Sequence, residues 1–201
     1  MGVQRHDHHA VAGQTRVADL GRYLDSEAGV VRSTTSELAW DYRVGLCRMD
    51  APKAQGAAGF FADHGEAVQL SDVTISSDNH YAAINVVSMD DQPLSGSGSI
   101  LIQFGSTARL TGWAVAEGTW SAPSGKDKGE QLEGLIIDWT GEPPWQLTAP
   151  EQTTITIANP DLTTATLLDE NGYPARDIPL EQADGAVRVH LPTETMYVVV
   201  Q

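Results

Sequence analysis

Short runs in which apolar and polar residues alternate recur along this chain. In one run Val73 and Ile75 alternate with Thr74 and Ser76, and the same spacing returns over residues 81–88. Successive side chains of a strand point to opposite faces, so such a run fits a strand buried on one side. Clusters of Ser, Asp, Asn and Pro separate the runs at sandwich-like spacing. The chain is therefore predicted to be all-β, an antiparallel β-sandwich, and not a (β/α)₈ barrel, whose strands alternate with long helices.

The expected elements follow from the same patterns. One short N-terminal helix is predicted over residues 17–24, whose apolar positions are spaced as one helical stripe. Residues 116–128 are predicted to be a loop, and residues 141–145 to interrupt the strands, because two prolines cannot both lie in a central ladder. Asn171-Gly172 predicts a hairpin turn. The predicted strands cover residues 30–32, 36–42, 46–50, 58–61, 68–75, 81–88, 99–104, 135–139, 153–158, 164–168, 186–191 and 196–200.

The length bounds the domain organisation. A chain of 201 residues buries roughly 70% of its unfolded surface, so a core forms without a disulfide or a metal. Residues 1–15 are polar and irregular and are predicted to be a linker or arm. Residues 16–143 are expected to form the main sandwich. Residues 144–201 form either a C-terminal β-hairpin subdomain or a continuation of that sandwich.

Composition excludes several classes of function. The formal net charge is −15 and the sequence pI is near 4.5. Nucleic acids and anionic membranes attract clustered Lys and Arg, so neither is expected as a partner. No apolar run reaches the roughly 18 residues of a membrane span, and the polar start does not fit a secretory signal peptide. Cys47 has no second cysteine to pair with, and its apolar strand predicts a buried structural thiol.

The segment around Trp40 is the most distinctive part of the sequence. Leu38, Trp40 and Tyr42 share one side of an extended segment, as in a half-buried strand. A short break then lets residues 46–50 return antiparallel. Pro52 ends that second strand because proline has no amide N–H for a ladder.

This segment carries a resemblance to a known family. The motif residues are Thr35-Ser36-Glu37-Leu38-Ala39-Trp40-Asp41, Asp50-Ala51-Pro52-Lys53-Ala54-Gln55 and the following Gly59-Phe60. They resemble the non-catalytic β-sandwich region that follows the catalytic barrel in certain bacterial glycoside hydrolases and related secreted hydrolases. Residues 99–105 with Thr111-Gly112-Trp113, 165–173 and 191–200 are similar too, so the resemblance covers nearly all of the chain after about residue 16. Thr34, Ser36 and Ala51 depart from the family pattern, which has Asp, Gly and Thr there.

The resemblance implies a role and a partner. It implies an accessory domain whose partner is the catalytic domain of the parent protein, and a parent that is secreted or periplasmic. Trp40 is then expected either in the core or in the interface with that domain.

Common catalytic and metal-binding motifs are absent from the sequence. The sequence has no Gly-x-Ser-x-Gly elbow, no His-Glu-x-x-His pair and no phosphate-binding Gly-x-x-x-x-Gly-Lys loop. Glu130 with Glu133, and Asp138, are the best carboxyl candidates for glycoside cleavage, but a solvated acidic face explains them. His6, His8 and His9 form a poorly preorganised cluster. No catalytic residue, metal site or cofactor is therefore predicted.

Exposed aromatic rings are the remaining candidates for a site, because the C–H face of a sugar packs on them. Trp113, Trp120 and Trp145 lie in or beside glycine- and proline-rich connections, where a large ring is hard to bury, and Trp139 is ambiguous. These four are the predicted carbohydrate-binding residues. Packing under loops or on a catalytic domain is the alternative for them.

The predicted function is a non-catalytic accessory β-sandwich domain of a glycoside hydrolase that packs on the catalytic barrel and contacts polysaccharide. The competing prediction is a stand-alone β-sandwich hydrolase or lyase that uses paired carboxylates. A cleft with two facing carboxyls of raised pKa would favour the enzyme.

Overall fold

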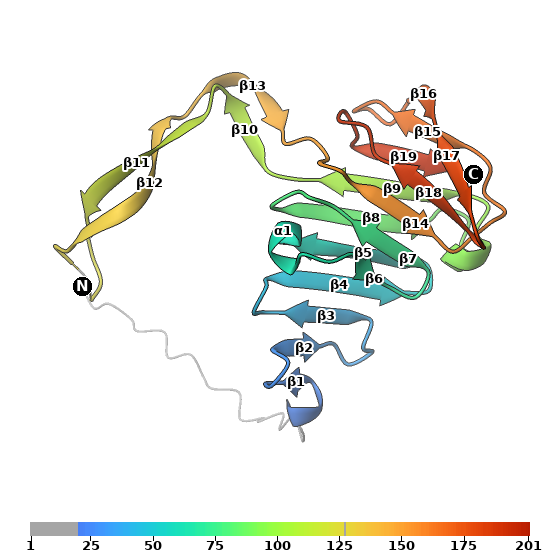
Figure 1. Ribbon diagram of the computed structural model, residues 1–201, viewed down its shortest axis with the longest axis horizontal. Coiled ribbons are helices and arrows are strands. Elements are labelled where there is room, and N and C mark those ends of the chain that lie inside the picture. The colour runs from blue at the N-terminus through green and yellow to red at the C-terminus, as the bar shows by residue number, and fades with distance from the viewer. Residues whose placement is uncertain (1–19, 127) are drawn as a thin grey trace, which may run out of the picture.

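The computed structural model describes residues 20–126 and 128–201. Two antiparallel sheets form the body, and a long two-stranded arm projects from it (Figure 1). Helical structure in these residues is limited to α1 (Phe61–His64) and the 3₁₀ turns η1 (Leu20–Arg22) and η2 (Leu94–Gly96). The predicted all-β, sandwich-like fold class is thus confirmed. Within the same residues, no helix has the length and apolar composition needed to cross a bilayer.

The larger sheet has ten strands, in the order β1-β2-β3-β4-β5-β8-β9-β19-β15-β16. Its first five strands are consecutive hairpins, so this half of the sheet follows the order of the sequence. The strands are β1 (Leu24–Asp25), β2 (Val30–Arg32), β3 (Leu38–Asp41), β4 (Leu46–Ala51), β5 (Ala54–Gly59), β8 (Ala82–Ser88), β9 (Ile100–Gly105), β15 (Ala165–Leu168), β16 (Pro174–Ile178) and β19 (Tyr197–Val200).

The smaller sheet has five strands, in the order β17-β18-β14-β7-β6. They are β6 (Val68–Gln69), β7 (Val73–Ser76), β14 (Thr154–Ile157), β17 (Leu180–Ala183) and β18 (Ala186–His190). β14 pairs with β7 so that Ile155 lies opposite Ile75, and β19 pairs with β9 of the larger sheet. Strands from before and after residue 143 therefore share both sheets.

The core lies between the two sheets and follows from the period-two pattern. In β8, Ile84 and Val86 are fully buried while Ala83 and Val87 are only partly covered. Each fully buried Ile or Val stabilises the fold by about 1.5–3 kcal/mol through removal of apolar surface from water. The largest fully buried apolar side chains come from both sheets and their connections: Leu46, Ile75, Ile84, Leu94, Ile100, Ile102, Ile155, Ile157 and Leu162.

The strand around Trp40 turns its large side chains outward. Ala39 is buried, whereas Leu38 and Trp40 on the other side of β3 are about half exposed. The prediction that Trp40 lies in the core is therefore wrong, because alternation shows which residues share a face but not which face is covered. Cys47, beside Trp40 in the register, is partly exposed and not fully buried as predicted.

Several boundaries differ from the predicted ones. Of the helix predicted over residues 17–24, the described part holds only the turn η1, and Leu24 is already in β1. The strand predicted over residues 58–61 is shifted, because β5 starts at Ala54 and Phe61 begins α1. β16 and β17 were not predicted, since both are edge strands of their sheets and polar residues interrupt their alternation.

Candidate functional site

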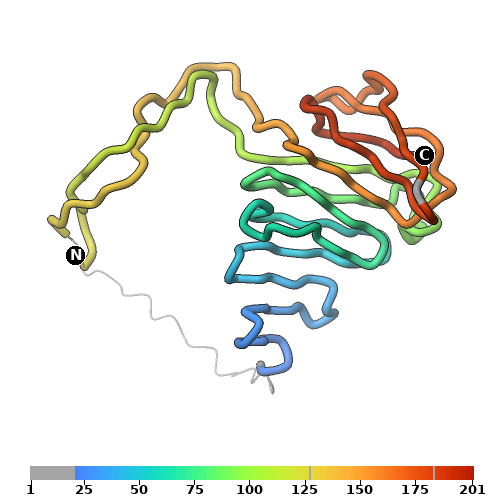
Figure 2. The backbone as a smooth tube through the Cα atoms, viewed as in Figure 1, coloured from blue at the N-terminus to red at the C-terminus, as the bar shows by residue number. Residues whose placement is uncertain are grey.

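The arm is built from two ribbon segments joined end to end. In the first, β10 (Ala108–Thr111) pairs with β13 (Glu142–Leu147), and in the second β11 (Ala114–Ser121) pairs with β12 (Gln131–Trp139). Figures 1 and 2 show the arm leaving the end of β9, bending between the two segments and running away from both sheets. Its residues therefore have solvent on both faces of the ribbon.

Glycine pairing explains why residues 116–121 form a strand where a loop was predicted. Gly118 lies directly opposite Gly134. A Cβ on Gly118 would come within 2.6 Å of Ile136 Cδ1, and one on Gly134 within 3.3 Å of Trp120 Cη2. The two glycines thus make room for side chains of the opposite strand, which is a role of glycine inside strands.

The predicted interruption at residues 141–145 is also wrong. β13 runs through Pro143 and Pro144, and the bond between them is cis. The register passes from the pair Leu110–Trp145 to the pair Thr111–Glu142, so the two prolines form a bulge. In a two-stranded ribbon each strand has one free edge, so neither proline has to donate an N–H to a neighbour. In a central strand both edges are paired and those N–H groups would be needed.

Asn79 anchors the returning strand of the arm to the body. Its side chain is buried, its amide N–H donates to the Ala149 carbonyl at 2.8 Å, and its carbonyl oxygen accepts from the Glu151 N–H at 2.8 Å. Thr107 and Thr148 close the ribbon where it leaves the body, with the Thr148 N–H donating to the Thr107 carbonyl at 2.9 Å. The arm thus starts from a hydrogen-bonded base.

All four tryptophans predicted to bind carbohydrate lie on this arm. Trp145 is 68% exposed, Trp139 53% and Trp120 38%. Trp113, between β10 and β11, is partly buried, and the Arg109 guanidinium lies 4.9 Å from the centre of its ring. The fifth tryptophan, Trp40, lies on the sandwich body. The structure therefore gathers residues spread over 33 positions onto one projecting element.

The arm also carries exposed aliphatic side chains that sequence reasoning missed. Leu135 is 69% exposed, Ile137 56% and Val115 49%. Val115 lies opposite Ile137, and Leu135 is two residues from Ile137 on the same strand. The run Leu135-Ile136-Ile137 was the available signal, because three consecutive aliphatic residues cannot all be buried by one covered face.

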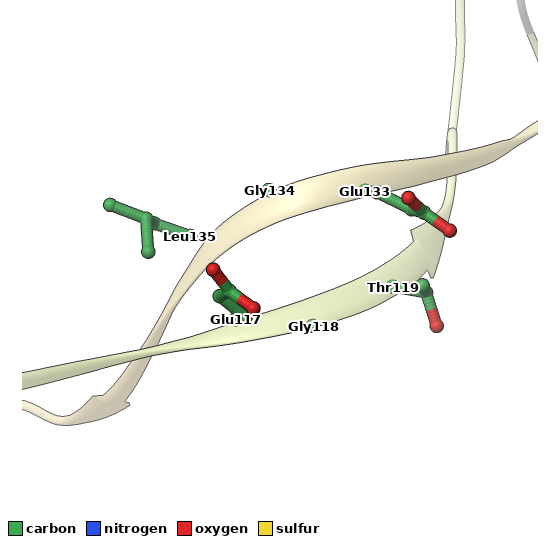
Figure 3. A pocket seen from close by; sticks show the side chains of 6 residues that line it. All are labelled: Glu117, Gly118, Thr119, Glu133, Gly134 and Leu135. Carbon is green, nitrogen blue, oxygen red and sulfur yellow. The ribbon is translucent and has the colours of Figure 1, made fainter.

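A shallow groove of about 600 Å³ lies along the middle of the outer ribbon segment. Figure 3 shows Glu117 and Glu133 projecting from neighbouring strands, with Leu135 and Thr119 beside them. Carboxylates in such a groove can accept hydrogen bonds from sugar hydroxyls. Both glutamates are exposed to water, whereas the acid of a glycosidase is held protonated by surroundings that withdraw it from water. Glu130 and Asp138 do not line this groove.

The carboxyls with shifted pKa values lie on the body. Asp90 accepts hydrogen bonds from the Ser97 and Ser88 hydroxyls and from the Gly98 and Gln92 N–H groups. These bonds, with that of Ser97 the largest contribution, lower the pKa of Asp90 to about 2.

Glu194 shows a shift in the same direction. The hydrogen bond from Arg176 lowers the pKa of its carboxyl. Both shifts favour the ionised form, opposite to the raised pKa that the enzyme alternative requires.

No metal-binding cluster of three or more His, Cys, Asp or Glu side chains is present in residues 20–126 and 128–201. His6, His8 and His9 lie outside those residues. A hydrogen bond of 2.8 Å joins Nδ1 of His190 to the Thr154 hydroxyl on the neighbouring strand of the same sheet.

No protein-family model, curated protein sequence or solved structure matches the chain.

Proposed function

We propose that this chain is a non-catalytic accessory β-sandwich domain of a glycoside-hydrolase-like protein, and that its arm contacts polysaccharide and the catalytic domain. The observation that carries the proposal is the position of the four tryptophans. An arm that exposes Trp145, Trp139 and Trp120 leaves large apolar area in water unless something covers it. An isolated two-stranded ribbon is itself only marginally stable, so a covering partner also stabilises the arm.

The part of the arm nearest the body carries both rings and polar groups. Trp145 lies opposite Leu110 on one face of the ribbon, and the neighbouring cross-strand pair of Arg109 and Gln146 points to the other face. The Arg109 guanidinium lies 4.9 Å from the centre of the Trp113 ring. An indole ring offers a flat apolar face to the C–H side of a pyranose, while guanidinium and amide groups bind its hydroxyls. The presence of both kinds of group at this part of the arm supports polysaccharide contact there.

The aliphatic residues suit a protein partner. Val115, Leu135 and Ile137 offer no flat ring for a sugar but do offer the branched apolar surface typical of protein interfaces. This middle part of the arm is therefore assigned to the catalytic domain.

Affinity gel electrophoresis against several soluble polysaccharides tests the proposal. We expect at least one polysaccharide to retard the chain, and Trp145→Ala or Trp139→Ala to weaken its binding about tenfold, since an exposed stacking ring contributes about 0.5–1.5 kcal/mol beyond its buried area. Tyr173→Ala is the matched control, because Tyr173 is 69% exposed, like Trp145 at 68%, but lies on the body. Retardation that both arm variants retain, or that only Tyr173→Ala abolishes, would contradict the proposal.

A further inference from the structure

The larger sheet has a second exposed surface, the face that points away from the five-stranded sheet, here called the outer face. Burial fixes its position: Ile84 in β8 and Ile102 in β9 point into the core, so Ala83 and Leu101 point outward. Each outward residue along these strands is only partly covered by its neighbours. In residues 20–126 and 128–201 no further sheet stacks on this face. Near β9 and β19 the turn at Glu170–Gly172 borders a hollow lined by Leu101, Tyr197 and Val199.

Side chains on the outer face change in size in an ordered way. One cross-strand row runs from Trp40 through Cys47, Ala58 and Ala83 to Gly105. Trp40 is 51% exposed and packs edge-to-face with Tyr42, with ring centres 5.9 Å apart. The two rings form a ridge at one end of the row.

The rest of the row is low. Cys47, Ala58, Ala83 and Gly105 have at most one heavy atom beyond Cβ, so this part of the row, here called the trough, stands lower than the ridge. The trough crosses four strands, or about 14 Å at the spacing of a sheet. It is therefore wide enough for two aromatic rings.

The geometry points to a second copy of this chain as the occupant of the outer face. With a two-fold axis between the copies, the ridge of each inserts into the trough of the other, so that both contacts are made at once. Such a self-complementary contact closes as a dimer and leaves no free interface. The arm plays no part in it, so this inference is independent of the proposed function.

Charge favours contact between copies at this place. Residues 20–59, which supply the ridge and half of the trough, contain five basic and five acidic residues. Residues 60–201 contain five basic and twenty acidic residues. Two copies of so acidic a chain repel each other, and they can approach most closely through the part whose charges balance.

The available area suits a reversible dimer. Six strands from β3 to β19, each about five residues long, give a face of about 29 by 17 Å, or roughly 1,000 Å² for two copies. Interfaces of that size are at the lower limit of specific association. We therefore expect a dissociation constant on the order of 10 μM.

Sedimentation equilibrium of the chain over a range of concentrations tests the dimer. We expect Trp40→Ala, which removes the ridge, and Ala83→Arg, which fills the trough, each to weaken dimerisation at least about tenfold. Both side chains face solvent in a monomer, and circular dichroism checks that each variant is folded. Trp145→Ala on the arm is the control and should dimerise like the unaltered chain.

Mixing the two variants tests whether the ridge of one copy contacts the trough of the other. In a mixed dimer, the intact ridge of Ala83→Arg meets the intact trough of Trp40→Ala, so one of the two contacts is restored. The mixture should then form mixed dimers at concentrations where each variant alone is monomeric. An unaltered chain that stays monomeric at 100 μM, about ten times the expected dissociation constant, would overturn the inference and leave the outer face for another partner, such as a catalytic domain. Loss of dimerisation in Trp145→Ala alone would overturn it too.

Discussion

Replacing Gly59 by alanine is expected to lower the free energy of unfolding by about 4 kcal/mol, combining backbone strain with overpacking. Gly59 ends β5 at a φ of 145°, a conformation that side chains rarely allow. A Cβ there would press against the Gly45 carbonyl oxygen and lie 2.8 Å from Leu46 Cα, and backbone atoms cannot move aside as a flexible side chain can. Urea unfolding followed by circular dichroism measures the change.

Gly105→Ala provides the matched control. Gly105 belongs to the same sheet, and its Cβ would have the Ala83 carbonyl oxygen at 3.8 Å as nearest neighbour, an ordinary contact. Its substitution should change stability by less than about 1 kcal/mol. Equal decreases in the free energy of unfolding for the two variants would contradict the close approach of β5 to the turn at Gly45.

Replacing Ile155 by alanine is expected to cost about 3 kcal/mol, within the usual range for a buried Ile. Ile155 is fully buried in β14 and lies between Ile75 of β7 and Val189 of β18. Because residues from before and after the arm meet there, the whole body should unfold in one transition at lower urea, with the slope unchanged. Thr156→Ala, on the other face of the same strand, should cost less than about 1 kcal/mol.

This experiment also bears on domain organisation. A separate C-terminal subdomain would unfold in a transition of its own, and Ile155→Ala would move only that transition. Two resolved transitions would therefore contradict a single sandwich core.

The sequence predicts the strands that have one covered face and one wet face. β8 and β9 are examples, because burial of Ile84 and Ile102 imposes alternation on their neighbours. The same alternation could not tell which side of β3 is covered. Ala39 proved to be the inward residue and Trp40 the outward one, at 7% and 51% exposed.

The arm was the part that the sequence could not predict. Its ribbon has no covered face, so its apolar and polar residues do not have to alternate. Its glycines and prolines are typical of loops. Gly118 and Gly134 act as a pair only when they are brought opposite each other, and that register depends on residues sixteen positions apart. The tryptophans could be assigned to irregular connections from local composition, but their gathering on one element could not.

Nuclear magnetic resonance of the five indole N–H groups tests the proposed role of the arm most directly, because each tryptophan reports its own surroundings. The signals are assigned by single Trp→Phe variants and followed during addition of a polysaccharide fragment. The signals of Trp139 and Trp145 should shift and saturate, while that of Trp40 stays in place. A shift of the Trp40 signal alone, or no shift in any arm signal with every polysaccharide that retards the chain, would contradict the proposal that the arm holds the sugar.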